Sequence, residues 1–183
     1  MSRCSARKLS PVRKDEVDRI VEAWRRERPD LDPAPMEVLS RVSRLARHLD
    51  RRRREAFAQV RVNGAGLEPW EFDVLAALRR AGPPYELSPS ELMAQTLVTS
   101  GTMTTRVEKL AARGLVRRSR RETGDRRGVR VALTDAGRAA ADQALEALLG
   151  HERDLLAGLP EEDRPRLAAL LRQLVMPFDD VTA

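Results

Sequence analysis

The sequence contains few of the residues on which catalytic, redox and metal sites are usually built. Its 183 residues include one cysteine and two histidines. A single cysteine, Cys4, excludes a disulfide within the chain and is typical of a reducing compartment such as the cytoplasm. His48 and His151 stand far apart, and neither belongs to a metal-ligand or nucleophile motif. We therefore expect no catalytic residue, no metal and no cofactor, and a protein that is not an enzyme.

Aromatic residues and long apolar runs are also scarce. Aromatic residues make up 3% of the chain, and no stretch has the apolar length that a transmembrane helix needs. The N-terminal segment is basic but lacks the apolar core of a secretory signal. Hydrophobic residues still amount to 42%, enough for a core of leucine, valine and alanine. These features predict a folded cytoplasmic protein without a membrane partner.

The positive charge is concentrated in one short segment. The net charge is +6, and residues 113–130 hold eight arginines against Glu122 and Asp125. This segment therefore carries the whole excess, which indicates one polyanionic partner that docks on a defined face. The basic run at 47–54 lies inside a predicted helix with no recognition element nearby, so we interpret it as a solvated helix face.

Hydrophobic periodicity and capping signals divide the chain into four parts. They are a flexible tail (1–14), N-terminal helices (15–62), a region of short helices and two strands (63–134), and leucine-rich C-terminal helices (135–183). The predicted first helix places Val17, Ile20, Val21 and Trp24 on one face, and the second is expected to continue to about Val62.

The region 63–134 has the clearest local signals. A helix is expected from Pro69, and a capping box at Ser88 predicts a short second helix. A third helix is expected over 100–113, with Met103, Val107 and Leu110 buried. Two strand-like runs follow and form a hairpin, and Thr134 is expected to cap a long helix that ends near Leu156.

A helix-turn-helix followed by a basic hairpin is a winged helix, so we predict a mainly α fold with a small β-hairpin wing (α+β). The second helix of such a motif enters the DNA major groove, and an arginine at the hairpin tip can enter the minor groove. The predicted contacts to double-stranded DNA are Ser100, Thr102, Thr104, Thr105 and Lys109 on the helix and Arg120, Arg126 and Arg127 on the hairpin.

Residues 87–137 resemble the winged-helix core of the MarR family of bacterial transcription regulators. The matching segments are LSPSEL, the TxRVxxL helix, GLVxR, the DRR of the hairpin tip and the VxLTxxG closure. The resemblance implies a homodimer formed through the N- and C-terminal helices. It also implies binding to a pseudo-palindromic operator, usually for repression, and release by a small molecule.

An added N-terminal helix and the segment EFDVLAALRRAGPPY are similar to the urate-responsive subgroup of that family. The resemblance implies that Trp24, Asp73, Arg106 and Arg118 form a site for a small anionic effector such as urate. A carboxylate or phenolic effector is the alternative. We further expect Asp73 to pair with Arg118 when no ligand is bound, so that an anion would compete for Arg118 and displace the recognition helix.

Two other functions compete with this interpretation. A redox-sensing regulator of the same family would use Cys4, although this residue lies in the predicted tail. A winged helix that binds protein or RNA would not require arginines at the hairpin tip.

Overall fold

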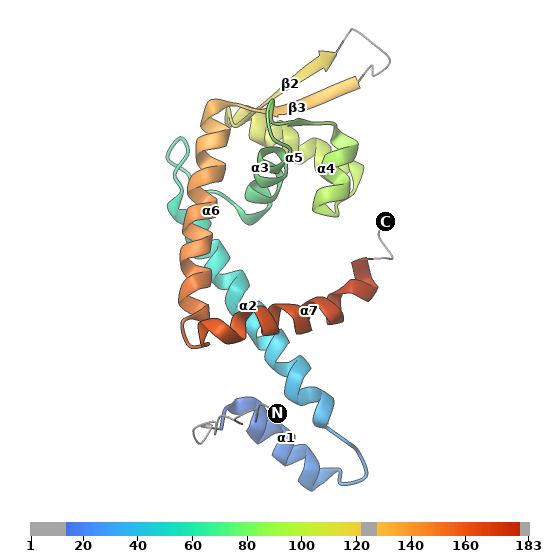
Figure 1. The fold of residues 1–183 in the computed structure, drawn as a ribbon. Helices are drawn as coiled ribbons and strands as arrows, with labels where there is room; N and C mark the ends of the chain where they lie inside the picture. Colours follow the sequence, from blue (N-terminus) through green and yellow to red (C-terminus); the bar gives the residue numbers. More distant parts are fainter. Residues whose placement is uncertain (1–13, 122–127, 180–183) are drawn as a thin grey trace, which may run out of the picture. The chain divides into compact units, whose positions relative to one another are not determined.

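The computed structural model describes residues 14–121 and 128–179, and this part consists of helices and one small antiparallel sheet (Figure 1). The chain divides into two compact units, with the boundary between Asp50 and Arg51 inside the second helix. In chain order the elements are α1 (Glu16–Glu27), α2 (Ala34–Gln59), α3 (Pro69–Arg80), β1 (Glu86–Leu87), α4 (Pro89–Thr96), α5 (Ser100–Ala112), β2 (Val116–Arg121), β3 (Gly128–Leu133), α6 (Asp135–Leu156), the 3-10 helix η1 (Glu161–Asp163) and α7 (Arg164–Asp179).

The first unit contains α1 and the first part of α2. The side chain of Asp15 accepts a hydrogen bond from the backbone N–H of Asp18, and the Asp18 carboxylate accepts one from the N–H of Asp15. This reciprocal capping box fixes the start of α1 at the predicted place. Val17 and Val21 on the predicted apolar face are buried, whereas Trp24 on the same face is 48% exposed.

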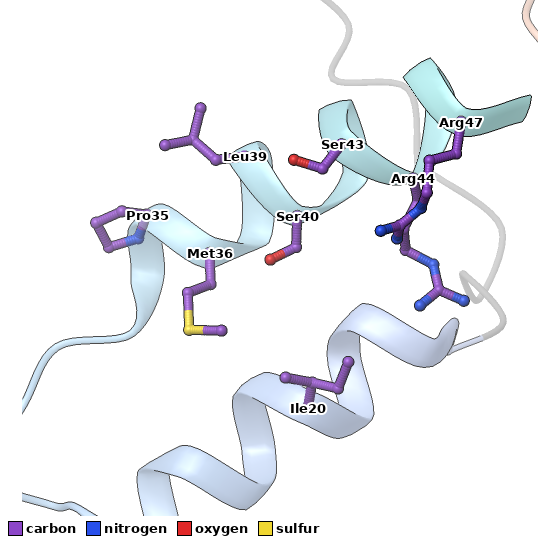
Figure 2. Close-up of a pocket in the computed structure, with 8 residues that line it drawn as sticks. All are labelled: Ile20, Pro35, Met36, Leu39, Ser40, Ser43, Arg44 and Arg47. Atoms are coloured by element: carbon purple, nitrogen blue, oxygen red, sulfur yellow. The ribbon is translucent and has the colours of Figure 1, made fainter. Parts of the chain in front are cut away.

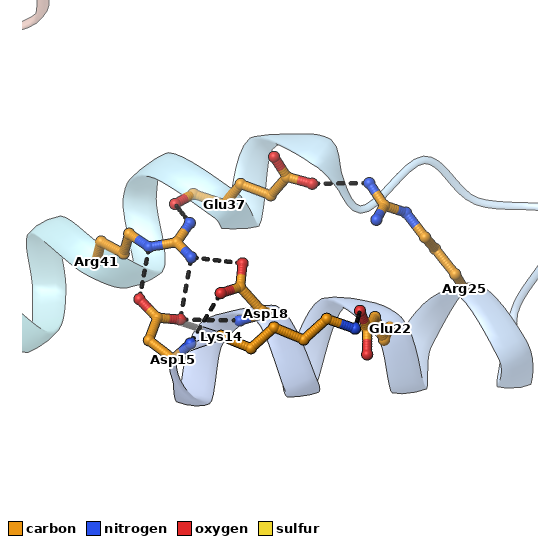
Figure 3. A network of polar contacts seen from close by, with 7 residues as sticks. All are labelled: Lys14, Asp15, Asp18, Glu22, Arg25, Glu37 and Arg41. Carbon is orange, nitrogen blue, oxygen red and sulfur yellow. Dashed lines mark hydrogen bonds and ion pairs between the residues drawn. The ribbon is translucent and has the colours of Figure 1, made fainter. Parts of the chain in front are cut away.

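Ion pairs join α1 to α2 in the first unit (Figure 3). The Arg41 guanidinium donates to Asp15 at 2.8 Å and to Asp18 at 2.7 Å. The hydrogen bond from Arg41 lowers the pKa of Asp15 to about 2. Arg25 donates to Glu37 at 2.7 Å farther along the two helices. Because these pairs lie near solvent, they orient the helices more than they stabilise them.

In the second unit, α4 and α5 form the predicted helix-turn-helix (Figure 1). The Ser88 hydroxyl accepts from the N–H of Glu91, and the Glu91 carboxylate accepts from the N–H of Ser88 at 2.6 Å. The predicted capping box is therefore confirmed. Helix α5 begins at Ser100 as predicted and ends one residue before Arg113.

The sheet has the strand order β1-β3-β2. Strands β2 and β3 form the predicted antiparallel hairpin, in which Val116 is paired with Leu133. The residues 122–127 that join them lie outside the described part of the chain. Strand β1 pairs with β3 through Glu86 opposite Ala132 and was not predicted, because two residues are too few to show an alternating pattern.

Helix α2 ends at Gln59, earlier than the predicted Val62, because the chain turns there. Val62 and Ala65 exchange backbone hydrogen bonds of 2.8 and 3.2 Å across a tight turn. Asn63 within it has a φ of 52°, a left-handed conformation that a helix cannot contain. The turn brings the backbone back toward α2, where the N–H of Leu67 donates to the carbonyl of Phe57.

The core of the second unit is almost wholly aliphatic, as the composition predicts. The rings of Phe57 and Phe72 stack within it, with centroids 4.4 Å apart. Helices α3, α5 and α6 and strand β3 supply most of the other buried side chains, among them Val74, Leu75, Leu78, Met103, Val107, Leu110, Val131 and Ala144.

A close backbone contact closes this core at the start of α6. The Thr134 side chain accepts from the N–H of Gly137, which makes it the predicted cap of α6. The Thr134 backbone N–H donates to the carbonyl of Leu115 at 3.1 Å. Gly137 lies against that carbonyl so closely that a Cβ atom would stand 1.9 Å from the oxygen. Only a residue without a side chain fits there.

Candidate DNA-binding surface and effector residues

Helix α5 presents a continuous polar face to solvent. The residues predicted to contact DNA are all exposed on it: Ser100, Thr102, Thr104, Thr105 and Lys109. Met103, Val107 and Leu110 are buried on the opposite face. The small residues along the exposed face allow an extended polymer to approach the helix closely, and Lys109 adds a cation in its last turn.

The threonine hydroxyls on this face are engaged within the helix. Thr104 donates to the carbonyl of Ser100 at 3.1 Å, and Thr105 donates to the carbonyl of Gly101 at 3.2 Å. A hydroxyl can rotate from such a bond to a phosphate oxygen at little cost. These side chains are therefore held in place yet can donate to a partner.

An open groove of about 410 Å³ runs beside this face. The Arg106 guanidinium lies over the ring of Trp70, 5.6 Å from its centroid. Trp70 belongs to the first turn of α3, and the remaining lining residues are Gly101, Thr102, Thr105 and Lys109. The contact between Trp70 and Arg106 joins α3 to α5, and no local signal in the sequence indicates it.

Asp73 does not pair with Arg118, so that prediction is wrong for this chain. Its carboxylate accepts a hydrogen bond from Arg53, twenty residues earlier. The Arg53 guanidinium also lies 5.4 Å from the ring centroid of Phe57 and 5.8 Å from that of Phe72. Arg53 belongs to the basic run interpreted as a solvated face, and for this residue that interpretation is also wrong.

Arg118 instead lies 3.8 Å from Glu108 of α5, with both side chains largely exposed. Three of the four predicted effector residues thus have separate partners: Asp73 contacts Arg53, Arg106 contacts Trp70 and Arg118 contacts Glu108. Trp24 belongs to the first unit, where it lines a hollow of about 260 Å³ with Leu31, Pro33, Pro35 and Met36.

Two further arginines of the basic segment also have carboxylate partners. Arg130 donates to Glu91 at 2.9 Å and is 15% exposed in its side chain. Arg113 pairs with the buried carboxylate of Glu71 and also donates to the carbonyls of Val62, Ala65 and Gly66. The segment therefore presents less charge to a polyanion than its composition suggests.

Several predicted residues cannot be placed. Arg126, Arg127 and Cys4 lie outside the described part of the chain, as does the side chain of Arg120. Among the described residues, no group of three or more histidine, aspartate or glutamate side chains is arranged to hold a metal ion. None of the described helices combines the length and apolar character required to cross a bilayer.

Comparison with known proteins identifies relatives of this chain. Residues 65–128 match the model of the MarR family. The chain is 40% identical over 156 residues to the HTH-type transcriptional regulator PecS of Dickeya dadantii, covering 85% of this chain and 90% of PecS. It is 33% identical to the HTH-type transcriptional repressor NicR of Pseudomonas putida, covering 79% of this chain and 89% of NicR.

A solved structure agrees with these relatives. BpsR of Bordetella bronchiseptica, whose DNA binding is regulated by 6-hydroxynicotinic acid, superposes with a TM-score of 0.55 and 28% identity. The match covers 73% of this chain and 98% of BpsR. With a helix-turn-helix, a basic β-hairpin and relatives aligned over most of its length, the chain belongs to the MarR family of transcriptional regulators.

Proposed function

We propose that the protein is a repressor that binds a pseudo-palindromic operator as a homodimer and is released by a small anion, with urate as the first candidate. The observation that carries the DNA-binding part is the exposed face of α5, where threonines and Lys109 stand clear of the core. The β2–β3 hairpin follows directly in the chain and carries exposed Arg117 and Arg118. A helix for the major groove and a basic wing together form a reading surface.

Dimerisation is supported by apolar side chains that remain exposed on the long helices. Leu145, Leu149 and Leu156 lie along α6, and α7 exposes Leu170, Leu174 and Phe178 at intervals of one helical turn. Such regular exposed stripes are typical of a surface that another chain covers. Two copies related by a two-fold axis would present two α5 helices to two half-sites, which accounts for a palindromic operator.

The second part of the proposal concerns the residues that bind the effector. Trp24, Asp73, Arg106 and Arg118 are the proposed residues, with the arginines as partners for the negative charge and the indole as the flat apolar surface. Arg106 is on α5 and Arg118 is on β2, so an anion that drew both toward itself would displace the recognition helix. Effector control of BpsR by a small aromatic acid supports an anionic effector of this size.

The DNA-binding part is tested with Lys109→Ala. We expect the dimer to bind a fragment from its own upstream region tightly and random DNA weakly. Removing Lys109 should weaken both, because a phosphate contact carries no sequence information. The slope of log K against log salt should fall in magnitude by about two for a dimer, since each lost phosphate contact is worth about 0.9. Fluorescence anisotropy at several salt concentrations measures this.

The control for that experiment is Lys14→Ala, which removes the same charge from the first unit. Its salt dependence should match that of the unchanged protein. Equal affinity for the upstream fragment and for random DNA in the unchanged protein would contradict operator recognition.

The effector part is tested with Arg118→Ala and its neighbour Arg117→Ala as the matched control. We expect urate to release DNA from the unchanged protein and from Arg117→Ala at similar concentrations. Release of DNA from Arg118→Ala should require at least about ten times more urate, because the anion has lost one charged hydrogen-bond partner. Release of all three proteins at the same urate concentration would rule out Arg118 as an effector residue, and release by 6-hydroxynicotinate alone would replace urate by a carboxylate.

A further inference from the structure

A second site is suggested by a groove in the first unit, between α1 and the beginning of α2 (Figure 2). Its volume is about 430 Å³, within the range of pockets that hold small molecules. It contains none of the four proposed effector residues. The lining residues are Ile20, Pro35, Met36, Leu39, Ser40, Ser43, Arg44 and Arg47.

One end of the groove is apolar and aliphatic. In Figure 2 the Met36 side chain points from α2 toward α1, where Ile20 stands opposite. Pro35 and Leu39 complete this end, and no aromatic ring lines the groove. Methionine and branched aliphatic side chains adapt to a flexible hydrocarbon chain. The apolar end therefore suits an aliphatic group better than a flat ring.

The other end carries two arginines that lack a carboxylate partner among the described residues. Arg44 and Arg47 are three residues apart on α2, so they are neighbours on the helix surface and repel each other unless an anion lies between them. Ser40 and Ser43 also line the groove, and their hydroxyls make no side-chain hydrogen bond within the described chain. Two guanidinium groups and two hydroxyls form a set of donors for one oxyanion.

Several other cations of the first unit are paired with carboxylates. Arg41, Arg25 and Lys14 each contact a carboxylate of the first unit (Figure 3). Arg41 alone contacts both Asp15 and Asp18. These carboxylates are thus engaged by other cations, and Arg44 and Arg47 have no carboxylate partner within the described part of the chain.

We propose that this groove binds an amphipathic anion with an aliphatic tail and a carboxylate or phosphate head. The head lies between Arg44 and Arg47 and accepts from the serine hydroxyls, and the tail lies against Ile20 and Met36. The groove shares Pro35 and Met36 with the hollow that Trp24 lines, but none of the four proposed effector residues lines the groove itself. Binding there does not require the operator or urate.

The experiment uses the full-length protein and two probes, decanoate and decyl phosphate, below their micelle-forming concentrations. We expect saturable binding of at least one probe by isothermal titration calorimetry, with one molecule per chain. Binding of decanoate alone identifies a carboxylate ligand, and stronger binding of decyl phosphate identifies a phosphate ester. Acetate, which has no tail, and decanol, which has no charge, should each bind at least tenfold more weakly.

The test variant is Arg44→Gln/Arg47→Gln, and the control is Arg26→Gln/Arg54→Gln, which removes the same charge from exposed arginines outside the groove. Affinity for the better probe should fall at least tenfold in the test variant and stay unchanged in the control. A second variant, Ser40→Leu, should lower affinity by filling the groove while all arginines remain. Circular dichroism and sedimentation of each variant establish that it is folded and in the same oligomeric state.

Three outcomes would overturn the proposal. They are the absence of saturable binding by either probe, equal loss of affinity in the test and control variants, and equal binding of decanol. Dissociation of dimers in Arg44→Gln/Arg47→Gln, with no probe bound by the unchanged protein, would assign the groove to contact between copies. If neither probe binds, the proposed operator binding is unaffected, because DNA affinity is measured in a separate experiment.

Discussion

Alanine in place of Gly137 is expected to unfold the second unit or to leave it barely stable. The new Cβ atom would lie 1.9 Å from the backbone oxygen of Leu115 and 2.9 Å from its carbonyl carbon. Neither atom can move aside, because this carbonyl accepts the N–H of Thr134 and β2 begins at the next residue. The start of α6 would have to separate from the sheet, and we expect a loss of about 3 kcal/mol or more.

Thermal and urea unfolding of Gly137→Ala measure this effect, and Gly150→Ala is the matched control. Gly150 lies in the same helix, and a Cβ atom there would have no neighbour within 4 Å. Alanine at that place should leave stability unchanged or raise it by about 0.5–1 kcal/mol, since glycine is the poorer helix former. If both variants unfolded at the temperature of the unchanged protein, the close approach of α6 to Leu115 would be disproved.

Removal of the Arg113 side chain is the second change with a large expected effect. Glu71 is 2% exposed and its carboxylate depends on the Arg113 guanidinium for its counter-charge. The same guanidinium satisfies three backbone carbonyls of the turn that follows α2. Arg113→Ala would leave a buried charge unpaired, so we expect a loss of about 3–5 kcal/mol in the free energy of unfolding.

Two further variants separate the charge from the other contacts of Arg113. Arg117→Ala removes an exposed arginine nearby and should change stability by less than about 0.5 kcal/mol. Glu71→Gln/Arg113→Ala replaces the buried carboxylate by a neutral amide and should be more stable than Arg113→Ala alone. A double variant as unstable as Arg113→Ala would show that the carbonyl contacts, and not the ion pair, hold this region together. Urea unfolding of the four proteins measures the differences.

The helices and the hairpin could be predicted because their signals are local. Ser88 and Glu91 form their capping box within four residues, and Thr134 caps α6 in the same way. The polar and apolar faces of α5 follow from helical periodicity alone, so the exposure of Lys109 and the burial of Val107 were both predictable. Contacts of this kind need no knowledge of which elements meet in space.

The partners of the charged residues could not be predicted, because they depend on packing between distant segments. Arg113 is the first residue of the basic segment 113–130, and nothing nearby in the sequence marks it as the counter-charge of Glu71. The sequence alone does not show which arginine pairs with Asp73. The partner is Arg53 of α2, whose guanidinium also lies over the rings of Phe57 and Phe72. A count of charges therefore overestimated how many arginines are available to DNA.

The two tryptophans have a spectroscopic consequence, since the first unit contains Trp24 and the second contains Trp70. Trp70 lies beside Arg106 on the surface assigned to DNA, whereas Trp24 lies in a separate apolar hollow. In a variant that keeps only one tryptophan, the tryptophan fluorescence therefore comes from one unit alone. Duplex DNA or a small molecule can be added to each of these two single-tryptophan variants. The variant whose fluorescence changes then shows which unit the added molecule contacts, and no attached label is needed.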